Sequence, residues 1–192
     1  LDAFRNDFQR RQSRPPAPGR GGPAGADFPV YESRITKNDI VYFPYLSPIL
    51  DEILIAAFTA KGYRAEILPF DPGMLHLGYK YVSGGECLPN VAVVGSIVDL
   101  FQKNRLDVSR GVLYLGDSCV ACNFHQYTSL IRAACRKAGI EKLRIYSPKM
   151  GVPGQGLPQE LSFDIAPSNV LGSLLYTLYF RVHPYEREPG NT

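Results

Sequence analysis

The sequence predicts an α/β domain with a doubly wound, Rossmann-like parallel sheet that carries helices on both faces. Short apolar runs alternate along the chain with longer amphipathic stretches, and this alternation is typical of a parallel sheet covered on both sides. The chain has 192 residues, of which 45% are hydrophobic. That composition suffices for one domain with a substantial core.

The first half of the pattern predicts two strands and two helices. Asp39–Tyr45 is an apolar run rich in β-branched and aromatic residues, which indicates a buried strand. Pro48–Lys61 is amphipathic and is followed by Gly62, a good residue to end a helix. Arg64–Pro69 is expected to form the second strand, and Pro72–Tyr79 a short helix.

The second half predicts two more strands and three more helices. Leu88–Lys103 is a helix with proline near its first turn, and Gly111–Gly116 is a strand. Cys122–Ala138 is a helix that ends at the glycine after it, and Leu143–Ser147 is the last strand. A final helix is expected over Ser168–Val182, with its first residue as the N-cap.

The chain is expected to consist of a linker followed by one domain. Residues 1–27 are rich in proline and glycine and predict a flexible linker. Residues 28–192 carry the α/β pattern. Because the chain begins with Leu1 and not with methionine, we expect it to be an incomplete piece of a longer protein, one part of a larger subunit.

Charge and hydropathy argue against two classes of partner. The net charge of +3 is carried by residues 1–20, which hold five arginines against two aspartates, so the remaining residues are electrically balanced. A balanced body predicts no binding to nucleic acid. The sequence has neither an apolar run of about 18 residues nor a signal peptide, so we expect no membrane span and a cytoplasmic location.

Three cysteines lie in two short loops, each directly before a predicted helix. Cys87 belongs to the motif Ser-Gly-Gly-Glu-Cys-Leu-Pro, and Cys119 and Cys122 form a Cys-x-x-Cys pair. The amino end of a helix lowers the pKa of a thiol, and the thiolate is the form that binds metal. Three thiolates suit an iron–sulfur cluster with one open iron position, but the spacing alone also permits zinc, a redox dithiol or coincidence.

The cysteine pair follows a predicted strand closely. Cys119 comes three residues after the strand Gly111–Gly116. Parallel sheets bind ligands beyond the carboxyl ends of their strands. The pair is therefore expected on the functional edge of the sheet.

The other candidate residues have more than one interpretation. Glu86, next to Cys87, could be an acid–base group or could cap the following helix, and His125 could donate a hydrogen bond at the site or lie exposed. Cys135 lies far along the helix that follows Cys122, so we expect a buried structural thiol.

At these motifs the chain resembles the 2-hydroxyacyl-CoA dehydratase family, and in particular the dehydratase-like part of long proteins fused to ATP-dependent activator modules. The resemblance covers residues 31–192. It rests on four segments, at residues 62–69, 81–89, 122–127 and 183–190. The two motifs of the family are usually close to Ser-Gly-x-Glu-Cys-x-Pro and Gly-Pro-Cys-Arg-Phe-Gly-Gln-Tyr. This chain departs from the second motif at three places. Asn123 stands in place of the arginine, His125 stands in place of the second glycine, and Val120-Ala121 stands in place of the Gly-Pro pair.

The resemblance implies a [4Fe–4S] cluster held by Cys87, Cys119 and Cys122, with one iron position open. It implies a lyase that removes water from a 2-hydroxyacyl-CoA thioester by radical chemistry, after one-electron reduction by an ATP-dependent activator, in anaerobic metabolism. The activator and the remainder of the parent chain or a partner subunit are the expected partners, so this fragment alone is expected to be inactive. Two alternatives stay open. The first is an iron–sulfur electron-transfer or cluster-carrier module, or an activase-associated domain without its own turnover. The second is a non-catalytic zinc-binding or interaction domain.

Overall fold

The computed structural model describes residues 34–116, 122–148, 158–188 and 190, and it contains a four-stranded parallel sheet. The strand order is β2-β1-β3-β4, and all three neighbouring pairs are parallel. The strands are β1 (Ile40–Phe43), β2 (Arg64–Ile67), β3 (Gly111–Tyr114) and β4 (Arg144–Tyr146). The predicted parallel α/β fold is confirmed, whereas the predicted linker at residues 1–27 lies outside the described residues.

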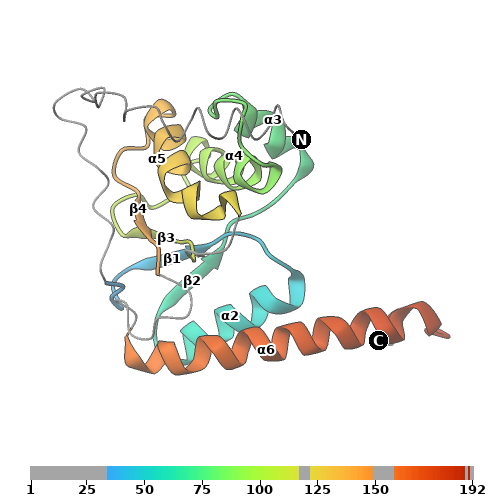
Figure 1. The fold of residues 1–192 in the computed structure, drawn as a ribbon. Helices are drawn as coiled ribbons and strands as arrows, with labels where there is room; N and C mark the ends of the chain where they lie inside the picture. Colours follow the sequence, from blue (N-terminus) through green and yellow to red (C-terminus); the bar gives the residue numbers. More distant parts are fainter. Residues whose placement is uncertain (1–33, 117–121, 149–157, 189, 191–192) are drawn as a thin grey trace, which may run out of the picture. The chain divides into compact units, whose positions relative to one another are not determined.

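Helices cover both faces of this sheet (Figure 1). On one face lie α3 (Pro72–Tyr79), α4 (Leu88–Gln102) and α5 (Tyr127–Lys137), and on the other lie α2 (Pro48–Ala60) and α6 (Gln159–Val182). There are also two 3-10 turns in the described ranges. The turn η1 (Asn123–Gln126) precedes α5, and the turn η2 (His183–Tyr185) follows α6. None of the helices in the described ranges is both long and apolar enough to cross a bilayer.

The core forms two layers because neighbouring residues of a strand point to opposite faces. Ile40 and Tyr42 of β1 belong to the layer that includes Ile97 of α4 and Ile131 of α5. Their neighbours Val41 and Phe43 belong to the layer that includes the α2 residue Phe58 and the α6 residue Leu161. Both layers are buried, which explains why the first strand is apolar at every position.

The last helix begins earlier than the sequence predicts. It starts at Gln159, so Ser168 is an interior residue and not the N-cap. The Ser168 hydroxyl donates to the carbonyl oxygen of Asp164 at 2.6 Å, one turn back. Serine favours N-caps because it bonds to nearby backbone, but the same short side chain can bond to the preceding turn inside a helix, and the prediction was wrong for that reason.

Two glycines allow α3 and α4 to cross at very short distance. A Cβ atom placed on Gly78 of α3 would lie 2.2 Å from the carbonyl oxygen of Val91, and one on Gly95 of α4 would lie 2.0 Å from that of Met74. Real Cβ atoms do not approach backbone so closely, and backbone cannot move aside as a flexible side chain can. The crossing therefore depends on the absence of side chains at both positions, and it holds α4 in place over the sheet.

We predict that Gly95→Ala destabilises the domain by about 1–3 kcal/mol, because overpacking outweighs the gain in helix propensity. Chemical denaturation followed by circular dichroism measures this change. Gly85→Ala is the matched control, since nothing lies within 4 Å of a Cβ atom at Gly85. Equal stability of the Gly95→Ala variant and the parent would show that the helices separate without cost.

Candidate functional site

Cys87 and Cys122 occupy equivalent positions in the structure, each as the N-cap residue of a helical segment. Cys87 precedes α4 and Cys122 precedes η1, both with extended backbone and neither with a side-chain capping hydrogen bond. In contrast, α2 is capped by the Ser47 hydroxyl and α3 by the Asp71 carboxylate. The backbone N–H groups that begin α4 and η1 therefore have no side-chain cap and could interact with an anion.

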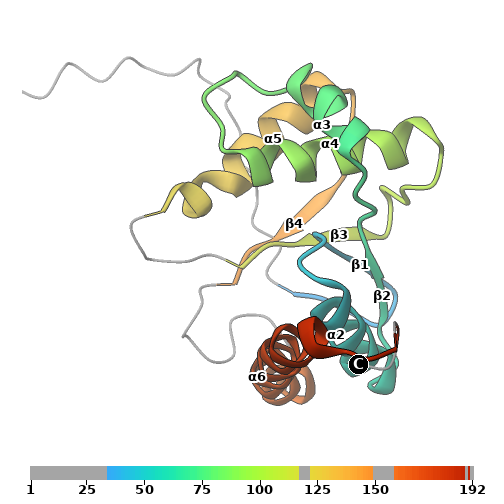
Figure 2. The same cartoon turned by 90° about the vertical axis from the view of Figure 1, so that its right-hand side faces the viewer.

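The topology places both cysteines at the carboxyl edge of the sheet. The helix α4 leads back to the beginning of β3, so it starts at the edge where the strands end, and η1 and α5 follow the end of β3. Figure 2 shows α4 and the η1–α5 segment beginning on the same side of the molecule. Because ligands of parallel sheets bind at this edge, the position agrees with the expectation from the sequence.

Tyr127, the first residue of α5, contacts Cys87. Its hydroxyl lies 2.6 Å from Sγ of Cys87. Burial is the main cause that raises the pKa of Tyr127, and the hydrogen bond to Cys87 and the proximity of the Cys87 and Cys122 side chains raise this pKa further. The phenol therefore stays protonated near neutral pH, and it can donate a hydrogen bond to the Cys87 sulfur whenever that sulfur is ionised.

Glu86 organises the loop that carries Cys87. Its carboxylate accepts hydrogen bonds from the backbone N–H of Ser83 at 2.9 Å, the Ser83 hydroxyl at 2.9 Å and the backbone N–H of Gly84 at 2.8 Å. The hydrogen bond from the Ser83 backbone is the main reason why the pKa of Glu86 lies below its ordinary value. The group is ionised and held within its own loop, so its contacts are those of a residue that positions Cys87.

Asn90 was not singled out from the sequence, and it is the most unusual polar residue at the site. It lies in the first turn of α4, three residues after Cys87, and it is fully buried. Neither its amide nitrogen nor its amide oxygen has a hydrogen-bond partner among the described residues. An unpaired buried amide costs about 1–3 kcal/mol, so Asn90 is a destabilising residue in the first turn of α4.

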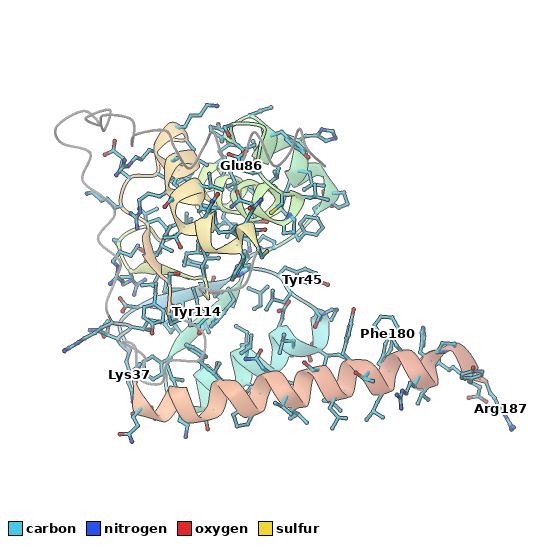
Figure 3. All side chains as sticks on the ribbon, in the orientation of Figure 1. Lys37, Tyr45, Glu86, Tyr114, Phe180 and Arg187 are labelled. Atoms are coloured by element: carbon cyan, nitrogen blue, oxygen red, sulfur yellow. The ribbon has the colours of Figure 1, made fainter. Side chains whose placement is uncertain are left out.

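Two other residues missed in the sequence are Tyr45 and Phe70, which follow the ends of β1 and β2. Their rings are stacked with centroids 6.3 Å apart, and both side chains are more than 40% exposed. Tyr45 is labelled in Figure 3, beside the end of the sheet. Aromatic residues directly after a strand were the available signal, but the sequence does not show that they lie side by side.

The structure brings together only part of the predicted cysteine set. Cys119 lies in residues 117–121, outside the described part of the chain, and the side chain of His125 is not described either. Among the described residues there is no group of three His, Cys, Asp or Glu side chains that could hold a metal ion. The described cysteines fit an iron–sulfur cluster by their chemistry, since Cys87 and Cys122 are thiols that lie at two helix starts on one edge of the sheet.

Cys135 stands apart from this site. Its side chain is only 4% exposed, in the core layer between α5 and the sheet. Burial raises the pKa of the thiol to about 12. The expectation of a buried structural thiol is confirmed.

Comparison of the chain with models of protein families, with curated proteins and with solved structures gave no match.

The contribution of Glu86 to loop stability should depend on pH. Its pKa is lowered from the ordinary value of 4.5 in the folded protein, so the stabilisation is present above pH 4.5 and is lost as the pH falls through the folded pKa. We expect hydrogen-exchange protection of the Ser83 and Gly84 amides, measured by NMR, to decrease below pH 4.5. In Glu86→Gln the protection should be lower at neutral pH by up to about fivefold, as for exposed charged hydrogen bonds.

The matched control for this measurement is Glu141→Gln, which changes an exposed glutamate between α5 and β4. It should leave the protection of both amides unchanged. Unaltered protection in Glu86→Gln would mean that the carboxylate does not brace the loop.

Proposed function

We propose that this chain is the [4Fe–4S]-binding domain of a 2-hydroxyacyl-CoA dehydratase-type lyase, which works in the cytoplasm with an ATP-dependent activator. The observation that carries the proposal is the placement of Cys87 and Cys122 at two helix starts on one edge of the sheet, with the Tyr127 hydroxyl 2.6 Å from the Cys87 sulfur. The family motifs around these cysteines support the choice of cluster and reaction.

In this proposal Cys87, Cys119 and Cys122 hold the cluster. A cluster with three protein thiolates supplies single electrons and an open iron position for the oxygen of a substrate. Glu86 keeps the Cys87 loop in its shape through Ser83 and Gly84. The Tyr127 hydroxyl donates to the Cys87 sulfur and reduces the negative charge on it, and such hydrogen bonds to ligand sulfurs are one way in which proteins tune clusters.

The thioester would lie at the carboxyl edge of the sheet, where the chain offers both apolar and polar contacts. The exposed rings of Tyr45 and Phe70 present a flat apolar surface at this edge, on which part of an acyl-CoA can stack. The uncapped start of α4 favours negative charge. It can therefore steady an oxyanion that develops on the thioester carbonyl.

An electron-transfer module is the second candidate, and the exposure of Cys122 favours it. A cluster held in part by an exposed residue is accessible to a redox partner without any substrate pocket. In that case the same thiols bind the same cluster, but a 2-hydroxyacyl-CoA has no effect on it.

Cys87→Ala should bind much less iron than the parent after anaerobic reconstitution, because it removes one of three proposed ligands. Iron and sulfide analysis, together with broad absorption near 400 nm, measures the cluster. Cys135→Ala is the matched control and should keep its full iron content, since its thiol is buried in the core. Equal iron in Cys87→Ala and the parent, or a colourless parent with bound zinc, would refute the cluster assignment.

Addition of a 2-hydroxyacyl-CoA should change the electron paramagnetic resonance spectrum of the reduced cluster, measured with the expected partner subunit and activator present. The change is expected because the substrate oxygen would approach the open iron position. Acetyl-CoA, which has no 2-hydroxyl group, is the matched control ligand. Under these conditions, a spectrum that stays the same at saturating 2-hydroxyacyl-CoA would favour the electron-transfer module over the dehydratase.

A further inference from the structure

The side chain of Tyr127 is fixed in the core next to Cys87. It is only 6% exposed, and it belongs to the core layer that also contains Val94 of α4. Its ring lies against the ring of Phe124 in η1, with centroids 4.9 Å apart and planes at 60°. Because the ring is buried and packed against a second ring, the hydroxyl keeps its place 2.6 Å from the Cys87 sulfur.

The direction of this hydrogen bond follows from what the sulfur binds. Either the thiol or the phenol can be the donor in the protein without a cluster. A thiolate sulfur that binds iron has no proton, so it can only accept a hydrogen bond. Burial is the main cause that raises the pKa of Tyr127, so the phenol keeps its proton at neutral pH and is the donor.

A hydrogen-bond donor to a ligand sulfur changes how readily a cluster accepts an electron. The bond is stronger when the sulfur carries more negative charge. One-electron reduction adds negative charge to the cluster and its ligands, so the bond stabilises the reduced state more than the oxidised state. Tyr127 is buried, and the low dielectric around a buried group strengthens its hydrogen bonds further.

We propose that Tyr127 acts through Cys87 and that its hydroxyl raises the reduction potential of the cluster. This inference rests on the proposed function, because it takes Cys87 as a cluster ligand, and it adds a role for a residue that binds no iron. In the proposed function the cluster must accept one electron from the activator. A hydroxyl that favours the reduced state lowers the free energy that this transfer requires, while the cysteines alone hold the iron.

Tyr127→Phe removes the hydroxyl and keeps the ring against Phe124. The full chain, reconstituted anaerobically and titrated with dithionite as the electron donor, gives the potential, and electron paramagnetic resonance reports the reduced cluster. The variant should hold as much iron and sulfide as the parent. Its equilibrium constant for one-electron reduction should be about tenfold smaller, which corresponds to a potential about 59 mV more negative. Fluorinated tyrosine, whose hydroxyl is a stronger donor, should shift the potential of the parent in the opposite direction.

Tyr63→Phe is the matched control. It also removes a hydroxyl from a buried tyrosine, but that hydroxyl donates to Glu160 of α6 at 3.1 Å, on the other face of the sheet. Its potential should equal that of the parent, and circular dichroism checks that both variants are folded. An unchanged potential in Tyr127→Phe, or loss of iron from the folded variant, would overturn this inference alone. A parent that binds no cluster would overturn the proposed function as well.

Discussion

The parallel pairing of β1 with β2 on one side and β3 on the other is the constraint on which the candidate site depends. Because the strands run in the same direction, they all end at one edge, and every helix that returns the chain to the next strand must begin there. The start of α4 and the start of the η1–α5 segment are therefore brought to the same edge, although Cys87 and Cys122 are far apart in the sequence. The common direction of the strands thus explains why Cys87 and Cys122 lie at the same edge of the sheet.

The position of α4 depends further on its contact with α3. The backbones meet at Gly78 and Gly95, where no side chain fits, and the opposite side of α4 packs into the core over the sheet through Val94 and Ile97. A helix held from two sides presents its first turn in one orientation. The packing of α3 against α4 therefore also fixes the position of Cys87, which is the N-cap residue of α4. A larger side chain at Gly78 or Gly95 would displace α4, and with it Cys87, as well as destabilise the fold.

The two sides of the sheet differ in what they leave accessible. At the carboxyl edge, Cys87 and Cys122 lie at two helix starts, and the Tyr127 hydroxyl lies 2.6 Å from the Cys87 sulfur. On the other face, the second half of α6 exposes apolar side chains on more than one side of the helix, among them Leu174, Leu178 and Phe180.

The order of the elements, most of their bounds and the placement of Cys87 and Cys122 before helical segments could be predicted from the sequence. These features depend on local patterns of apolar residues, glycines and prolines. Glycine at positions 62 and 139 shows this, since both adopt the positive φ that ends a helix. Ser168 shows the limit of such patterns, because a serine suited to an N-cap lies inside α6 and donates to the carbonyl oxygen of the preceding turn. Contacts between distant parts of the chain, such as Tyr127 with Cys87 or Tyr45 with Phe70, follow from the tertiary structure. They depend on strand order and helix crossing, which no local pattern encodes.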